Sequence, residues 1–293
     1  MTGSAESFCG ERNRTMTDIK QFQAQENILE KLYSEPKNLW KRILIILFIV
    51  GLMIWGASGT KIGIDEKGLN LAKSIFSGIT HPETLLLFNL TEKGIPYLVL
   101  ETIAIAFLST VIGSILAIPV SFLSSTNIVP KPVAYVFRAI VLFIRTIPSL
   151  VWALIWVRVT STGPFCGVVT QSVCSIGMIS KLNVTAIENL DTGVLEALDA
   201  CGANTFEKIR VGVLPQLSAS FVSTAIYRFD INLKDATILG IVGAGGIGFP
   251  LDAAINSARW SRVGAFLIVL IIMVVLIEFI STKIRARLAR GRS

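Results

Sequence analysis

Charged residues interrupt an otherwise apolar stretch of the chain at residues 217–242. They are Arg228, Asp230, Lys234 and Asp235, and Asn232 stands between them. Asp230 precedes Lys234 by four residues, which is the favourable spacing of an acid and a base on one helix face. A charge inside a membrane helix is costly, so such residues usually face a bundle interior or a water-filled path. The group predicts either a polar stripe lining a path for an anionic solute, or a self-neutralised network that only fixes helix packing.

A glycine-rich segment follows this stretch. Gly243, Gly245 and Gly248 match the pattern G-x-G-x-x-G, and Gly246 adds another glycine. No strand–helix–strand pattern surrounds the motif and no acid follows about twenty residues later, so a dinucleotide cofactor is not expected. Glycines permit a broken-helix backbone at membrane depth. We expect a hinge at an outer gate, whose backbone amides could meet an anion, or else a site of close helix packing.

The residue types that usually carry catalysis and metal binding are scarce. The chain has one histidine, His81, and its four cysteines show no metal-type pairing. The sequence shows no cluster of a nucleophile, a base and an acid, and the phosphate-binding pattern G-x-x-x-x-G-K-[ST] does not occur. We therefore expect no metal, no cofactor and no enzymatic activity in this chain.

Hydropathy indicates the elements that must position these residues. The chain is 52% hydrophobic and 16% charged, with a mean hydropathy of +0.66, and is more apolar than ordinary soluble domains. A helix needs about 20 apolar residues to cross a bilayer. Six stretches approach this length, at residues 43–59, 97–123, 133–157, 164–187, 217–242 and 263–282. The predicted fold class is an all-α polytopic membrane protein with about six transmembrane helices.

Composition also divides the chain into consecutive regions. In chain order these are a cytoplasmic tail with an amphipathic helix (1–40), a first transmembrane helix (41–60), an extracytoplasmic segment (61–96), a transmembrane core (97–283) and a basic cytoplasmic tail (284–293). The extracytoplasmic segment has one apolar face and predicts a helix resting on the outer membrane surface.

The distribution of positive charge predicts the orientation. Lysine and arginine are about twice as frequent beside the spans on the side that holds both termini, and that side is therefore expected to be cytoplasmic. Topology explains the net charge of +7, so nucleic acid is not an expected partner. The protein is expected in the plasma membrane, in contact with lipid, with residues 188–216 forming a long cytoplasmic loop.

This cytoplasmic loop carries strong local signals. Gly193–Cys201 predicts a short helix, and Gly202 can take the left-handed conformation that ends it. Asn204 precedes Glu207 by three residues, a capping box that opens a second short helix. Pro215 fits the first turn of the next span. Together these signals predict a stiff, bent lever beneath the membrane.

The loop resembles the EAA motif of ABC importer permeases, whose pattern is E-A-A, three residues, G, nine residues, I-x-L-P. The matching residues are Glu196, Ala197, Gly202, Leu214 and Pro215. Leu198 replaces the second alanine and Gly212 replaces the isoleucine. Further segments are similar to the phosphonate-importer permease, at residues 145–148, 151–154, 227–232 and 242–248. Ser149 departs from the acidic residue that this family often carries there.

The resemblance implies a type I ABC importer permease core with one extra N-terminal span. It implies a cytoplasmic ABC ATPase seated on the loop, an extracytoplasmic phosphonate-type binding protein, and a second copy of the chain. The expected function is import of phosphonate or a related phosphorus oxyanion by alternating access, with ATP hydrolysed by the separate ATPase. The alternatives are a permease for another small solute, such as methionine, and a membrane-embedded enzyme or sensor.

Overall fold

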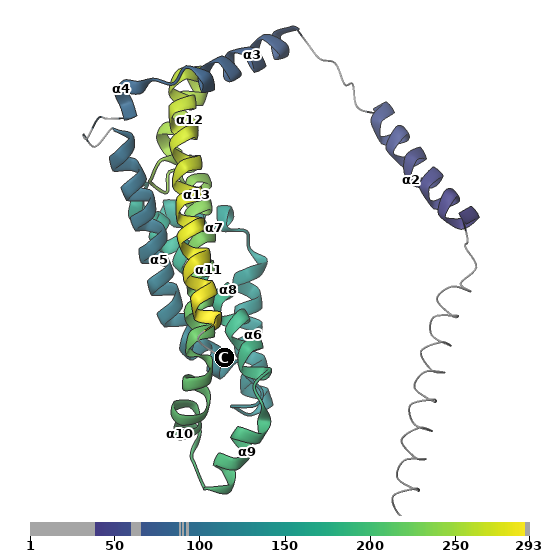
Figure 1. Cartoon of the computed structure of the whole chain (residues 1–293), viewed down its shortest axis with the longest axis vertical. Helices are drawn as coiled ribbons and strands as arrows, with labels where there is room; N and C mark the ends of the chain where they lie inside the picture. Colours follow the sequence, from purple (N-terminus) through teal and green to yellow (C-terminus); the bar gives the residue numbers. More distant parts are fainter. Residues whose placement is uncertain (1–38, 60–65, 88, 90, 92–93, 291–293) are drawn as a thin grey trace, which may run out of the picture. The chain divides into compact units, whose positions relative to one another are not determined.

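A computed structural model describes residues 39–59, 66–87, 89, 91 and 94–290 (Figure 1). All regular secondary structure within these residues is helical, which confirms the predicted all-α class. The amphipathic helix expected in the N-terminal tail lies outside the described residues. The chain divides into two compact units, residues 1–65 and 66–293.

The first unit contains helix α2 (Leu39–Gly59), at the place of the first predicted span. From Trp40 to Ser58 its side chains are exposed, including the large apolar ones. An apolar helix of this length suits the thickness of a bilayer. Because α2 is apolar all round, lipid or other helices must cover it.

Four long helices build the second unit, and each agrees with a predicted span. They are α5 (Ile95–Leu123), α8 (Pro164–Glu188), α11 (Leu214–Ile241) and α13 (Trp260–Arg290). Helices α5, α11 and α13 run side by side, and α8 packs on α5 and α11 (Figure 1). Small residues permit this close packing: a Cβ on Gly113 would lie 2.4 Å from the Cβ of Ser175.

The third predicted span, 133–157, was wrong as a single helix. The structure divides it into α6 (Lys131–Thr146) and α7 (Ser149–Thr160), which meet at 87°. Pro148 causes the break, because a residue that precedes proline is forced out of the helical region. Ile147 accordingly has an extended backbone, with φ −86° and ψ 122°. The indole of Trp152 holds the bend by donating to the carbonyl of Ile144 at 3.2 Å.

Shorter helices lie at the two ends of the bundle. Helix α3 (Glu66–Thr80) packs on the start of α13, where a Cβ on Gly264 would lie 2.1 Å from the carbonyl oxygen of Gly78. Helices α4 (Thr84–Leu87) and α12 (Gly248–Asn256) lie at the same end (Figure 1). The opposite end holds α9 (Thr192–Ala200), α10 (Thr205–Glu207) and a π-helical turn, η1 (Lys208–Val213).

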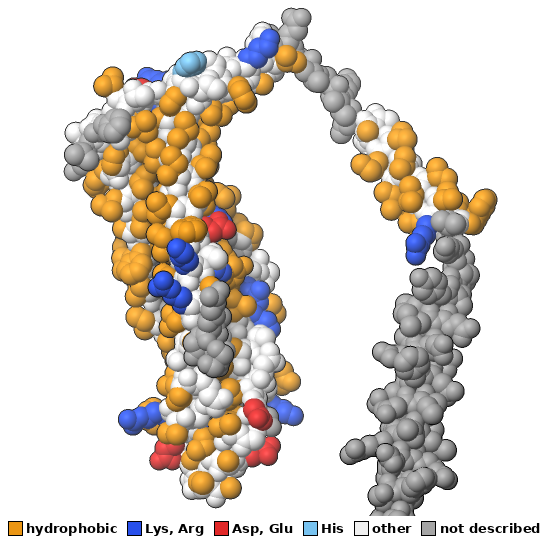
Figure 2. Space-filling view, in the orientation of Figure 1, with side chains coloured by type: hydrophobic (Ala, Val, Ile, Leu, Met, Phe, Trp, Pro, Cys, Tyr) orange, Lys and Arg blue, Asp and Glu red, His pale blue; other side chains and the backbone are white. Residues whose placement is uncertain are grey.

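The bundle surface is apolar along its length. Hydrophobic side chains cover most of the visible face over α5 and the upper part of α13, and charged side chains lie partway along the bundle and at the end that holds α9 and α10 (Figure 2). Five helices are long and apolar enough to cross a membrane within the described residues, or up to six if α6 and α7 count as one broken span. The protein is therefore a multi-pass membrane protein. Helix α13 continues to Arg290, so the described part of the predicted basic tail is helical.

Candidate functional site

Residues 192–213, here called the elbow, form a bent helical segment at one end of the bundle. Asp191 caps the first helix, α9, by accepting from the amide of Gly193 at 2.9 Å. Gly202 turns the chain with φ +76°, the left-handed conformation expected from the sequence. The Asn204–Glu207 capping box is present, with bonds of 3.0 and 2.8 Å.

The two arms of the elbow are held against each other. Lys208 in η1 forms an ion pair with Asp199 in α9, across the turn at Gly202. Gly212 is buried, and a Cβ at this position would lie 2.7 Å from the Cδ1 of Leu198. The glycine that replaces the motif's isoleucine therefore lets α9 approach η1 closely. Pro215 lies in the first turn of α11, and the second arm of the elbow (α10 and η1) continues into α11.

One side of the elbow is anchored in the bundle. Leu195, Val213 and Leu217 are buried in one cluster with Phe122, Ile187 and Phe221. These residues join α9 and η1 to the adjacent ends of α5, α8 and α11. The elbow is therefore packed directly against three long helices.

The other side of the elbow is open. Glu196 and Ala197 are exposed on α9, and Phe206 and Val211 are 69% and 63% exposed on the second arm. Exposed large apolar side chains that gather in one patch are typical of a surface that receives a partner protein. All five motif residues are exposed, namely Glu196, Ala197, Gly202, Leu214 and Pro215, and the packed base is formed by their neighbours in the chain.

The charged residues of α11 have partners other than those expected. The predicted Asp230–Lys234 pair is wrong: Asp230 binds Arg285 at 3.1 Å, and Lys234 binds Glu278 at 3.1 Å. Both partners lie on α13. Asp230 and Lys234 are therefore neutralised by a second helix instead of by each other along α11.

Arg228, Asn232 and Asp235 belong to a second group, directed toward α5 and α8. Arg228 lies 3.9 Å from Asp235 and donates to the hydroxyl of Ser175 at 3.0 Å. Asn232 is fully buried and donates to Thr110 at 2.8 Å and to Ser175 at 2.9 Å. The position of Asn232 agrees with a role in helix packing, which was the alternative to a polar stripe.

Sequence reasoning missed the partners of these residues. The missed residues are Glu278 and Arg285 on α13, Ser109 and Thr110 on α5, and Gln171 and Ser175 on α8. Their one signal was the presence of polar side chains within apolar spans. Gln171 shows their role, because it donates to the backbone carbonyl of Asn232 at 2.9 Å. It satisfies a buried polar group that would otherwise be costly.

The glycine-rich segment forms a tight turn between α11 and α12. Gly243, Gly245 and Gly246 have φ values of +91°, +81° and +72°. Gly248 starts α12, and a Cβ there would lie 2.0 Å from the carbonyl oxygen of Thr237. Positive φ and close backbone approach both favour glycine, which explains the composition of the turn.

Side chains of α5 accept hydrogen bonds from two backbone amides at this turn. Glu101 Oε1 accepts from the amide of Gly246 at 3.1 Å, and Thr102 Oγ1 accepts from the amide of Ile247 at 2.9 Å. The carbonyl oxygen of Gly243 also accepts from Gly163 at 2.8 Å. The Gly246 and Ile247 amides are therefore satisfied by the chain itself and are not free to meet an anion.

We expect Glu101→Ala to loosen the glycine turn, because it removes a charged acceptor, and such hydrogen bonds contribute about 1.5–3 kcal/mol. Amide hydrogen exchange across residues 243–248 should become about tenfold faster or more. Glu101→Gln keeps an acceptor oxygen and should exchange nearly as slowly as the wild type. Equal exchange in the alanine variant and the wild type would contradict this role for Glu101.

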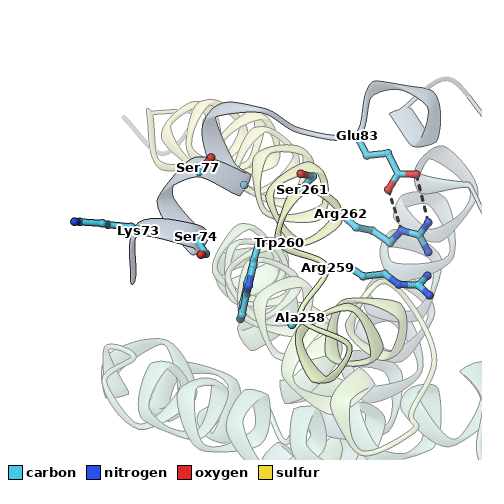
Figure 3. Close-up of a pocket in the computed structure, with 10 residues that line it drawn as sticks. Lys73, Ser74, Ser77, Glu83, Ala258, Arg259, Trp260, Ser261 and Arg262 are labelled. Atoms are coloured by element: carbon cyan, nitrogen blue, oxygen red, sulfur yellow. Dashed lines mark hydrogen bonds and ion pairs between the residues drawn. The ribbon is translucent and has the colours of Figure 1, made fainter. Parts of the chain in front are cut away.

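The opposite end of the bundle contains a cavity of about 630 Å³ between α3 and the start of α13. Arg262 binds Glu83 through two hydrogen bonds, of 3.1 and 3.3 Å (Figure 3). Lys73 points away from Arg259 and Arg262 in the same view. Lys73 therefore does not converge on one ligand with Arg259 and Arg262, which point in the same direction as each other. Among the described residues, no group of three His, Cys, Asp or Glu side chains could hold a metal ion.

The bent helix pair, the elbow and the glycine turn all lie within one matched region. The family described as binding-protein-dependent transport system inner membrane component matches residues 109–293. The chain belongs to this family. The matched region begins inside α5 and extends through α13, and it excludes α2, α3 and α4.

Relatives and solved structures agree with this family. The Phosphate-import permease protein PhnE of Mycolicibacterium smegmatis is 38% identical over 189 residues, which are 64% of this chain and 36% of that protein. The chain thus spans about a third of that relative's length. The Phosphite transport system permease protein PtxC of Stutzerimonas stutzeri is 33% identical over 64% of this chain and 68% of its own. An inward-facing structure of the MetNI methionine ABC transporter matches with TM-score 0.58 and 26% identity, over 66% of this chain and 95% of that chain.

Proposed function

We propose that this inner membrane component is one transmembrane subunit of an ATP-driven importer that carries phosphonate or a related phosphorus oxyanion by alternating access. The elbow carries the proposal. It combines an exposed face at Glu196 and Ala197 with a base that packs against three long helices. Relatives with names that specify phosphate and phosphite support the substrate class.

The proposed assembly contains two copies of this chain, two ABC ATPase subunits and one binding protein. The ATPase docks on the elbow, which places residues 188–216 and both termini in the cytoplasm. The binding protein docks at the opposite end, where α3 and α13 meet. Closure of the ATPase pair pushes the two elbows, and the buried cluster around Leu195 passes that movement to the helices. Hydrolysis of ATP belongs to the partner, and this chain supplies no covalent chemistry.

The glycine turn and the polar residues of α11 take complementary roles in this scheme. We assign Gly243, Gly245, Gly246 and Gly248 to a hinge at the outer gate. Helix α11 then moves as one body with the second arm of the elbow, because η1 leads into α11 without a break. Asp230 and Lys234 join α11 to α13, so that both helices move together beside the path.

Uptake by the reconstituted importer tests the substrate class. Proteoliposomes that contain the permease, its ATPase and its binding protein should accumulate methylphosphonate, phosphite or phosphate in an ATP-dependent, saturable manner. Methionine should not compete. Vesicles without the binding protein are the matched control, and their uptake of these oxyanions should be much lower.

A second candidate is import of methionine or a similar small solute. It is favoured by the methionine transporter structure, 95% of whose chain is covered by the match. The same vesicles separate the two candidates. Saturable methionine uptake without uptake of any phosphorus oxyanion would establish the second candidate and reject the first.

A further inference from the structure

A small cavity of about 210 Å³ lies between α6 and α8. Its apolar wall consists of Val141, Leu142 and Val184, and its polar wall consists of Ser124, Arg138, Arg145 and Lys181. Three cations from two helices thus face one space. No carboxylate is among the residues that line it.

Only one of these cations is already paired with an acid. Arg138 binds the carboxylate of Glu188 and donates to the carbonyl oxygen of Ser124 at 2.8 Å. Arg145 and Lys181 are exposed, and neither forms an ion pair with a described residue. The cavity therefore holds two positive charges that are available to a ligand.

Arg145 on α6 and Lys181 on α8 both lie at a distance from the end of α8. The stem of Arg145 crosses α8 at Gly177, where a Cβ would lie 2.9 Å from the Cγ of Arg145. Gly177 is about three turns, or roughly 16 Å, from the end of α8 at Glu188. Lys181 lies about one turn closer to that end. A cation this deep in a span usually faces a water-filled cavity, because exposure to lipid is costly.

The cations of α11 cannot serve in the same way. Arg228 is directed toward Asp235 and Lys234 binds Glu278, so an anion could reach either one only in competition with a carboxylate. Arg145 and Lys181 have no such competitor. Unpaired positive charge is thus available on the face formed by α6 and α8, whereas the cations of α11 are paired.

We propose that Arg145 and Lys181 form an anion-binding site on the translocation path, which takes a tetrahedral phosphorus oxyanion. The proposal rests on the proposed function and specifies where its substrate is bound within this chain. The planar guanidinium of Arg145 can donate two parallel hydrogen bonds to an oxyanion, and Lys181 adds a compact charge. Two cations match the charge of a phosphonate. The apolar wall fits a small alkyl substituent on phosphorus.

Binding to the assembled permease and ATPase, without binding protein and in phosphatidylcholine nanodiscs, tests this site. Methylphosphonate is the probe, and phosphorus nuclear magnetic resonance reports its bound fraction. Arg145→Gln and Lys181→Gln should each weaken binding about tenfold, which corresponds to about 1.4 kcal/mol. Lys181→Arg should retain most of the affinity. Arg158→Gln, which removes an exposed cation of α7 outside the cavity, is the matched control and should bind as the wild type does.

Unchanged affinity in Lys181→Gln and in the double variant Arg145→Gln/Lys181→Gln would overturn the site. If variants that carry Arg145→Gln fail to fold, Lys181→Gln alone still tests it. Equal weakening by Arg158→Gln would also overturn it, since the effect would then be one of overall charge. A lipid phosphate offers the same chemistry as free phosphonate. Phosphatidylcholine nanodiscs with and without phosphatidylglycerol separate the two sources. Methylphosphonate binding that depends on both cations in the absence of phosphatidylglycerol supports the site. If Arg145 and Lys181 are needed only for an effect of phosphatidylglycerol on the protein, and not for binding of methylphosphonate, the site is overturned.

Failure of the proposed function has a different signature. Wild-type vesicles that take up no phosphorus oxyanion reject the function before any variant is made. Wild-type vesicles that transport methylphosphonate, together with cavity variants of unchanged affinity, reject only the site. ATP hydrolysis stimulated by the binding protein should persist in Arg158→Gln, because Arg158 is part of neither the cavity nor the elbow.

Discussion

Replacing Gly202 by proline is expected to reduce uptake more than any other single change in the elbow. Gly202 has φ +76°, and its amide donates to the carbonyl oxygen of Asp199 at 2.9 Å. Proline fixes φ near −65° and has no amide hydrogen, so both features are lost, at a cost of about 3 kcal/mol or more. The arms of the elbow should separate, and uptake should fall at least about tenfold. Transport and ATP hydrolysis measured in the same proteoliposomes check this prediction.

The form of the defect matters as much as its size. Because the ATPase still contacts an elbow of altered shape, hydrolysis should continue but should no longer respond to the loaded binding protein. Gly202→Asn is the matched control, since asparagine tolerates the left-handed region, and most of the uptake should remain. Normal uptake in Gly202→Pro would show that the bend is not needed for coupling.

Local signals in the sequence were sufficient to predict the elbow. A glycine that ends a helix and a capping box act within a few residues of themselves, so their geometry does not depend on distant parts of the chain. The structure confirms Gly202 in the left-handed region and the box at Asn204 and Glu207. The role of Gly212 was not predictable in this way, because it depends on the approach of Leu198 from the other arm.

Hydropathy predicted the long spans but not the break between α6 and α7. Residues 145–149 are a short, largely polar interruption between two apolar runs, and the predicted span joined these runs across it. Pro148 was the local signal, and its effect on Ile147 follows from sterics alone. The break matters for the proposed anion-binding site, because Arg145 lies beside α8 just before the chain turns by 87°.

The partners of Asp230 and Lys234 could not be predicted from sequence spacing. The four-residue rule states which side chains of one helix are neighbours, but it does not state what the next helix offers. Asp230 and Arg285 are 55 residues apart, and Lys234 and Glu278 are 44 apart. Only the packing of α11 on α13 brings these pairs together. The correct partners therefore required the structure.

Arg285→Ala is expected to destabilise the folded bundle more than any other change to the charges of α11 and α13. Asp230 is buried, with 8% of its side chain exposed, and its Oδ2 accepts from Arg285 at 3.1 Å. Its other oxygen has no hydrogen-bond partner among the described residues. Removing Arg285 therefore leaves an uncompensated buried carboxylate, which costs about 3–5 kcal/mol. The yield of monodisperse protein in detergent and its thermal unfolding temperature should both fall clearly.

Two further variants separate this explanation from a general loss of charge. Asp230→Asn combined with Arg285→Ala removes the buried charge along with its partner, and it should recover much of the stability lost in Arg285→Ala. Lys234→Ala breaks a pair whose side chains are 51% and 55% exposed, so its cost should be smaller than that of Arg285→Ala. If Lys234→Ala were instead the more damaging change, Asp230 would depend on its neighbour along α11, and the contact between α11 and α13 would not be what neutralises it.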